Sequence, residues 1–360
     1  MHALEVLGEV QRQFNVCNAC RYCEAYCAVF PAAQLRPALD DGDVLYLANL
    51  CHDCRDCFDA CMFAPPHAFA VNIPALLAAA RIRTYRRYTW PAIAGELFRN
   101  ARARVATLLV AAAVVLAAIL IGTGPANLSV ARHGPGAFYQ IVPVALMILP
   151  AMLVSVYGIG VMVAGLRGFW RGASGARLSP ANVGRALHDA FSLHYMKGGG
   201  AGCYYPATHG SQVRRNLHHA VFYGFVLAFV STTLAAIAQD VFGILPPFAI
   251  GSAPVVFGIA GGVLLVVGCS GLLLLKPQAD PAPQDRRMVA MDYAFLVILD
   301  LAALSGLLLL AFRETPAMGW LLTFHLCTLA GLYVTAPYGK FVHFIFRVAA
   351  LVKWAGERGR

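Results

Sequence analysis

Residues 17–27 read CNACRYCEAYC and residues 51–61 read CHDCRDCFDAC, so the spacing C-x2-C-x2-C-x3-C occurs twice near the amino terminus. Thiolates at these steps hold iron in a cubane, and the fourth cysteine of a run can reach the neighbouring cluster. We therefore expect two [4Fe-4S] clusters with crossed ligation. The ligands of the first would be Cys17, Cys20, Cys23 and Cys61, and those of the second would be Cys51, Cys54, Cys57 and Cys27.

The chain around these cysteines predicts a helical head. Its apolar residues lack the alternation of period two that half-buried strands require. Pro31 and Pro65 stand four residues after Cys27 and Cys61, whereas the bacterial ferredoxin run places its proline directly after the fourth cysteine. We expect an all-α, helical ferredoxin-like domain. Two zinc sites are the alternative, although zinc usually takes two separated cysteine pairs.

The placement of the cysteines indicates a reducing compartment. Eight of the eleven lie between Cys17 and Cys61, and such clustering favours metal over a disulfide framework. The first 16 residues contain no apolar core of the length that a cleavable signal needs. The cysteine domain, residues 1–104, is therefore expected in the cytoplasm.

The rest of the chain, residues 105–360, predicts a transmembrane helical domain. Hydrophobic residues make up 59% of the chain and charged residues 13%. A bilayer core about 30 Å thick requires roughly 20 apolar residues in each spanning helix. Six runs meet this requirement: Val105–Thr123, Phe138–Leu166, Ala220–Ala238, Val255–Leu275, Tyr293–Phe312 and Gly319–Phe346.

The basic residues give the expected orientation in the cytoplasmic membrane. With the amino terminus inside, the outer loops carry only Arg132 and Arg313, and the inner loops and tail carry every other Lys and Arg after residue 105. This excess on one side is typical of cytoplasmic loops, so both termini should be cytoplasmic. The net charge of +10 thus needs no nucleic acid, and no basic stripe interleaved with aromatics is present.

One inner loop, residues 167–219, is long for a compact bundle and contains the segment GGGAGC from Gly198 to Cys203. Long ordered loops are often functional. A flexible connector is the alternative.

Histidines near the membrane suggest one b-type haem. Ionisable residues within spans are rare and are functional candidates by default. His219 and His343 would lie at similar depth near the inner surface, where bundles hold cofactors between facing helices. We favour this pair, with His218 as a weaker candidate; purely interfacial histidines are the alternative.

His325 precedes His343 by 18 residues, which is five helical turns or about 27 Å on a single helix. This spacing resembles that of the dihaem cytochrome b subunit of respiratory nitrate reductases. No second intramembrane histidine lies at the depth of His325, so we expect it to face a quinone or, preferably, to hydrogen-bond another helix. His52 and His67 flank the second cysteine run and are interpreted as neighbours of the ligands or surface residues.

The chain offers no site for an organic substrate or a dinucleotide. No strand followed by G-x-G-x-x-G occurs in the head, and Gly258, Gly261 and Gly262 lie in an apolar span, where glycines serve helix packing. A dehydrogenase partner should supply the substrate site.

Four stretches closely resemble the tricarballylate-utilisation protein B family, also called citrate-utilisation protein B. They are CNACRYCEAYCAVFPA from Cys17, CHDCRDCFDACMFAPPHAFAVNIP from Cys51, GGGAGC from Gly198 and RRNLHHAVFYGF from Arg214, and the likeness covers essentially the whole chain. The resemblance implies that the protein reoxidises the FADH2 of a partner flavoprotein, which dehydrogenates tricarballylate to cis-aconitate. Electrons would pass through the two clusters to the membrane quinone pool.

Two other functions remain open at this point. One is a membrane-bound redox sensor or assembly subunit. The other is a subunit of a heterodisulfide-reductase-like enzyme, with Cys203 as its reactive thiol.

Overall fold

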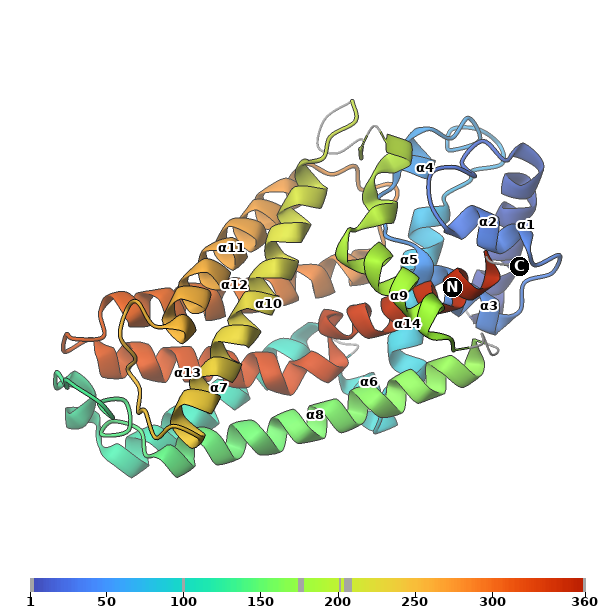
Figure 1. Cartoon of the computed structure of the whole chain (residues 1–360). Coiled ribbons are helices and arrows are strands. Elements are labelled where there is room, and N and C mark those ends of the chain that lie inside the picture. The colour runs from blue at the N-terminus through green and yellow to red at the C-terminus, as the bar shows by residue number, and fades with distance from the viewer. Residues whose placement is uncertain (1–2, 99–100, 174–177, 201, 204–208, 359–360) are drawn as a thin grey trace.

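The protein is all-α, as predicted. The structure, a computed structural model, describes residues 3–98, 101–173, 178–200, 202–203 and 209–358. These residues form α-helices, 3-10 turns and loops without a β-strand; an isolated bridge pairs Cys203 with Ser211. Figure 1 shows a head of short helices at one end of the molecule, from which the long helices extend, and both chain ends lie at the head.

The head consists of short helices that pack around two longer ones. Its helices are α1 (Ala3–Cys20), α2 (Val29–Gln34), α3 (Asp41–Leu50), α4 (Asp56–Asp59), α5 (Ile73–Arg87) and α6 (Ala92–Leu97). A capping box starts α3, because the Asp40 side chain accepts from the Asp43 N–H at 2.7 Å and Asp43 accepts from the Asp40 N–H. The apolar sides of α1, α3 and α5 meet in a core that includes Phe14, Leu47 and Leu77.

Among the described residues, six helices are long and apolar enough to span a membrane, as the sequence predicts. They are α7 (Ala101–Thr123), α8 (Val144–Gly172), α10 (Val213–Asp240), α11 (Ala253–Leu275), α12 (Arg286–Ala311) and α13 (Met318–Thr335). Helices α10, α11, α12, α13 and α7 pack one against the next in that order, and α8 contacts α13. This is the architecture of a multi-pass membrane protein.

The predicted single helix from Gly319 to Phe346 is wrong. Helix α13 ends at Thr335, two 3-10 turns follow, and α14 (His343–Glu357) starts in a new direction. Pro337 cannot donate a backbone hydrogen bond, so it interrupts the helical ladder at this point. His325 and His343 therefore lie on different helices, and the five-turn register expected between them does not exist.

The predicted loop from 167 to 219 contains a helix of its own. Helix α8 continues to Gly172, and α9 (Pro180–Phe191) follows, with the Ser179 side chain accepting from the Asn182 N–H at 3.2 Å as its N-cap. Helix α9 packs against α14. Of the glycine-rich segment, Ala201 lies outside the described residues.

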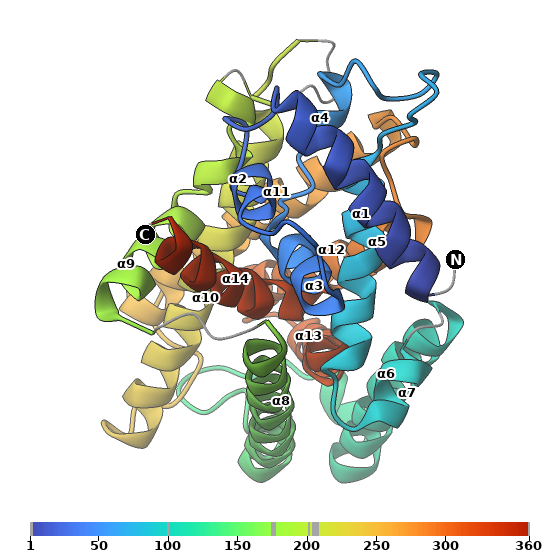
Figure 2. The same ribbon diagram turned by 90° about the vertical axis from the view of Figure 1, so that its right-hand side faces the viewer.

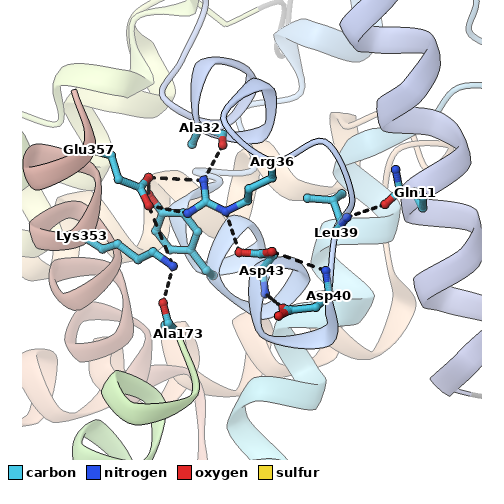
Figure 3. A network of polar contacts seen from close by, with 10 residues as sticks. Gln11, Ala32, Arg36, Leu39, Asp40, Asp43, Ala173, Lys353 and Glu357 are labelled. Atoms are coloured by element: carbon cyan, nitrogen blue, oxygen red, sulfur yellow. Dashed lines mark hydrogen bonds and ion pairs between the residues drawn. The ribbon is translucent and has the colours of Figure 1, made fainter. Parts of the chain in front are cut away.

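The C-terminal helix α14 leaves the membrane bundle and docks on the head beside α3 (Figure 2). A network of charges holds its end in place (Figure 3). The Glu357 carboxylate accepts from Arg36 and from the Tyr46 hydroxyl, the latter at 2.9 Å, while Arg36 also donates to Asp43 at 2.6 Å. The ammonium group of Lys353 lies 4.3 Å from the centre of the Tyr46 ring. The last turn of the chain is thereby part of the head.

Helices α10 and α11 approach each other closely because glycines line their contact. A Cβ atom on Gly261 would lie 2.7 Å from the Ala228 nitrogen and 2.8 Å from the Gly224 oxygen. A Cβ atom on Gly268 would lie 2.7 Å from the Val221 nitrogen. Small residues allow such backbone contact between membrane helices, and the glycines read from the sequence as packing residues include Gly261.

We predict that Gly261→Ala destabilises the protein. The added methyl group meets backbone atoms that cannot rotate away, and overpacking of this kind costs about 1–3 kcal/mol. Thermal unfolding of the detergent-solubilised chain should show a lower midpoint. Gly160→Ala on α8 is the matched control, because no heavy atom lies within 4 Å of its added Cβ; equal midpoints for both variants would contradict the assigned contact.

Candidate metal centre

The first cysteine run lies at the end of α1 and in the turn that follows. The chain leaves the helix at Arg21, whose φ of 59° is in the left-handed region, and the reversal brings Cys23 back towards Cys17. These two thiols, with Cys20, Cys57 and Cys61, line one cavity. Its walls are largely apolar and include Val16, Phe30, Phe63 and Ile73.

The thiols around this cavity influence one another. Burial raises the pKa of Cys17 to about 12, and the charges of Cys61, Cys23 and Cys20 act in the same direction. Burial likewise raises the pKa of Cys23 to about 12, with Cys61 as the largest charge contribution. A metal that binds such a group takes the place of the thiol protons, because only the thiolate is a ligand.

The second run is more deeply placed. Cys51 ends α3, and positive φ angles at Asp53 (55°) and Arg55 (74°) fold the loop so that Cys51 and Cys54 both become buried. Burial raises the pKa of Cys57 well above its usual value, and the charges of Cys54, Cys27 and Cys51 raise it further. Burial also raises the pKa of Cys27 to about 12, and Cys51 is its first charged neighbour.

The nearest charged neighbours divide the thiols into two groups that meet at Cys57, which also lines the cavity of the first run. Cys61 belongs with the first run and Cys27 with the second, which is the grouping that crossed ligation requires. In the described part of the chain, no three His, Cys, Asp or Glu side chains converge closely enough for a single metal ion, and the sulfurs of the first group surround a cavity instead. The donor set and its shape fit iron–sulfur clusters; the ligation itself stays a prediction.

Three arginines bind the loop that carries the second run. Arg214 of α10 donates from Nη1 to the Asp53 carbonyl at 2.7 Å. Arg347 of α14 and Arg81 of α5 both donate to the Cys51 carbonyl, and Arg81 also donates from Nε to the Ala48 carbonyl at 2.8 Å. The loop is therefore fixed to α5, α10 and α14 at once.

His218 of α10 and His343 of α14 face each other next to this loop. Their ring centres are 6.4 Å apart and the rings are nearly perpendicular, at 80°. His343 Nδ1 lies 2.7 Å from the Lys340 carbonyl; a carbonyl can only accept, so Nδ1 carries the proton and Nε2 is left as a free ligand. Burial, then Lys340 and His218, lower the pKa of His343 to about 3, which keeps the ring neutral.

The spacing of this pair suits a metal ion between two imidazoles. A metal–nitrogen bond is about 2.0 Å long, and the centre of an imidazole ring lies roughly 1 Å behind its nitrogen. Two such bonds in line separate the ring centres by roughly 6 Å. The Nδ1 atom of His218 is buried without a hydrogen-bond partner, so one of its nitrogens remains to be satisfied.

The other predicted histidines lie elsewhere. His219, the favoured partner of His343 in the sequence, instead lies beside Tyr223, with ring centres 5.7 Å apart and the rings tilted by 46°. Its Nε2 atom, like Nδ1 of His218, is buried without a hydrogen-bond partner, so the ring contact with His343 is what favours His218. His325 is within 2.9 Å of the Ser305 hydroxyl of α12, which agrees with the preferred interpretation of a helix-to-helix hydrogen bond. His67 accepts from the Phe69 N–H at 3.0 Å on the head surface.

His52 lies between the two sites. Its ring centre is 6.2 Å from that of Tyr195. Burial lowers its pKa well below the usual value, and the charges of Arg347 and His218 act in the same direction. This residue therefore connects the surroundings of the second cysteine run with those of the histidine pair.

The glycine-rich segment packs against the second run. Gly198 has a φ of +53°, and a Cβ atom there would lie 2.6 Å from the Asp56 carboxylate. Cys203 is fully buried and packs with Cys54 and Leu275, and burial raises its pKa to about 11. The segment is thus one wall of the site rather than a free connector.

The arginines were missed in the sequence, although a signal exists. Arg214 precedes His218 by four residues, and Arg347 follows His343 by four. Residues four apart share one face of a helix, so both helices present a histidine and an arginine side by side. The spans drawn from hydropathy placed these arginines in a loop and a tail.

Comparisons with known proteins agree with the division of the chain into a cysteine-bearing head and a membrane part. The family model described as "Citrate utilization protein B" matches residues 98–360, and the model described as "Citrate utilization protein B Fer4-like domain" matches residues 10–87. Citrate utilization protein B of Escherichia coli is 42% identical over 356 residues, which is 98% of this chain and 93% of that protein. No solved structure matches. Both cysteine runs fall within the Fer4-like match, which supports iron–sulfur chemistry in the head.

Proposed function

Because the chain belongs to the citrate utilization protein B family, we propose that it reoxidises the FADH2 of a partner flavoprotein and delivers the electrons to the membrane quinone pool. The path contains two [4Fe-4S] clusters and one b-type haem. The observation that carries the proposal is that the second cysteine run is attached to the two helices that bear the histidine pair. Arg214 attaches it to α10, which carries His218, and Arg347 attaches it to α14, which carries His343.

The partner flavoprotein is proposed to bind over the first cysteine group. Cys20 is exposed there, and Tyr22 and Met62, which line the same cavity, are 59% and 65% exposed. Cys51 and Cys54 of the second group are buried. Electrons would therefore enter at the surface of the head and move inwards. Tricarballylate is the substrate that the family resemblance implies for the partner.

His218 and His343 are proposed as the residues that would hold the haem, in place of the pair His219 and His343. A b-type haem held there supplies one-electron redox chemistry. The chain's own part is to hold the rings in place: the Lys340 carbonyl fixes the tautomer of His343, and the Arg214 and Arg347 contacts fix both helices to the head.

The orientation proposed for the molecule follows its basic residues. The head, the α9 segment and α14 carry most of them and would face the cytoplasm, with both termini on that side. Arg132 and Arg313 would lie on the opposite side, where Arg313 donates to the Phe248 carbonyl at 2.6 Å.

A thiol–disulfide reductase is the less supported function. Its reactive group would be Cys203, which is fully buried, whereas a thiol that attacks a substrate disulfide must be accessible. No contact in the described residues favours a redox sensor over an electron carrier.

We predict eight iron and eight sulfide per purified chain, with two reducible [4Fe-4S] signals in electron paramagnetic resonance (EPR). Crossed ligation adds a sharper expectation, because each fourth cysteine belongs to the other run. Cys61→Ser should alter the same signal as Cys20→Ser, and Cys27→Ser the same signal as Cys54→Ser.

Cys327→Ser on α13 is the control and should leave both signals unchanged. Uncrossed ligation would be revealed if Cys61→Ser and Cys54→Ser altered the same signal. Colourless, anaerobically isolated protein with stoichiometric zinc would refute the clusters altogether.

We predict that His218→Ala and His343→Ala each abolish the Soret absorption band of the purified protein. Each removes one of the two residues that would hold the haem, whereas His219→Ala should retain the band because His219 lies beside Tyr223 and not beside His343. Iron–sulfur content should stay unchanged in all three variants. Loss of the band only in His219→Ala would reverse the assignment, and a wild-type protein without any Soret band would remove the haem from the proposal.

A further inference from the structure

Arg81, which is buried, and Arg347, which is half-buried, meet at the second cysteine run, and within the described residues neither has a carboxylate in ion-pair contact. Arg81 is 4% exposed. The Nε and Nη1 atoms of Arg347 are shielded from solvent and have no hydrogen-bond partner. Within the described residues neither guanidinium forms an ion pair; both donate to the carbonyl of Cys51.

Such an arrangement is costly unless an anion lies nearby. A buried charge is normally paired, because desolvation costs several kcal/mol for each ion. Two like charges that share one acceptor also repel each other. Elsewhere in the head the chain does provide partners: Arg36 is paired with Asp43 and Glu357, and Arg83 with Asp41. The carboxylates that act on Arg81 are Asp53 and Asp292, and neither forms an ion pair with it in the described residues. Asp292 is instead paired with Lys276 and Lys340.

The second cluster would supply that negative charge. Four thiolates and a cubane together carry a net negative charge, which increases by one on reduction. Cations held nearby in a poorly hydrated interior stabilise the more negative, reduced form. We propose that Arg81 and Arg347 raise the reduction potential of the cluster held by Cys51, Cys54, Cys57 and Cys27 above that of the first cluster, an inference that rests on the proposed function.

The surroundings of the first group are different. Arg21 is the cation next to Cys20, and it is paired with Glu24 at 3.0 Å, with side chains 59% and 39% exposed. Water and salt screen such a pair, so its effect on a cluster is small. The difference in potential between the clusters thus follows from burial as well as from charge.

Acidic residues near the second group oppose the two arginines only in part. Asp56 is 1% exposed, and after burial its charge is the largest cause of the raised pKa of Cys54. Its neighbour Arg55 is 9% exposed and contributes a further cation. Arg81 and Arg347 are thus the cations in direct contact with the Cys51 backbone.

The direction of electron transfer follows from this difference. One electron leaves the first cluster, which is oxidised, and enters the second, which is reduced. The flavin supplies the electron and the acceptor in the membrane removes it. Arg347 lies on α14 one helical turn from His343, so the cation is located between the second cluster and the proposed haem ligand. Transfer from the head surface to the membrane helices is then downhill.

The test is a redox titration of the full-length protein in detergent, followed by EPR. In Arg347→Gln the higher of the two cluster potentials should fall by at least 59 mV, which is a tenfold change in the one-electron equilibrium, while the lower one stays in place. Arg81→Gln should shift the same cluster in the same direction. Arg347→Lys keeps the charge and should recover at least half of the shift. Arg12→Gln, at an exposed pair with Glu9, is the control and should change neither potential.

Other results would overturn the inference. Unchanged potentials in Arg347→Gln, equal shifts of both clusters, or a Lys variant as low as the Gln variant would each show that the charge does not set the potential. If the Gln variants lose four iron atoms per chain, the iron content of Arg347→Lys decides between the explanations. A Lys variant that retains eight iron atoms would support a role for the positive charge, and a Lys variant that also loses four would refute it. Wild-type protein without iron would refute the proposed function, whereas eight iron atoms with unmoved potentials would refute the inference alone.

Discussion

The docking of α14 on the head is the constraint on which the rest of the structure depends. Pro337 ends the helical ladder of α13, and the chain then turns away from the membrane bundle. Glu357, held by Arg36 and Tyr46, fixes the far end of α14 to α2 and α3. Between these two points the helix has little freedom, so the docking of α14 sets the positions of His343 and Arg347, and their contacts with the Lys340 and Cys51 carbonyls hold them there. The side chains of Arg36 and Glu357 are 11% and 17% exposed, so removal of either partner would leave a poorly solvated charge at the end of α14.

Helices α10 and α14 approach the second cysteine run with the same pair of residues. Each carries a histidine and, one turn closer to the head, an arginine that donates to a backbone carbonyl of the Cys51–Asp53 segment. One turn is about 5.4 Å along the axis, so both helices hold the histidine pair at a short and fixed distance from the loop. Backbone carbonyls do not change charge with the redox state, and the contacts can persist through every step of electron transfer.

Local patterns in the sequence were sufficient to identify the cysteine runs and to locate most of the candidate membrane spans. Thiol spacing and an apolar run of about 20 residues each act within a few helical turns, and their physical consequences do not require knowledge of the fold. The last helix could not be predicted in this way, because the residues beyond Pro337 remain apolar after the chain has left the bundle. His218 and His219 are adjacent and differ by about 100° around a helix, so only the packing of α14 decides which of them meets His343. Arg347 appears in the sequence as one cation of a basic tail, and its burial arises from contacts with α3 and α5 that are distant in the chain.

Some arginines of the head are paired with carboxylates, whereas Arg81 and Arg347 form no ion pair in the described residues. This difference also links folding with metal binding. A carboxylate at Cys51 would neutralise Arg81 and Arg347 in the free protein, but it would then repel a bound anionic cluster. Because neither guanidinium is paired with a carboxylate in the described residues, the two cations repel each other in the protein that lacks the cluster, and binding of the cluster relieves this repulsion. Because ligands that bind only the folded state stabilise it, the second cysteine run and the helices fixed to it should become more stable as the cluster is inserted. The first group, with Arg21 paired to Glu24 at the surface, has no such requirement, so its contribution to the stability of the head is smaller.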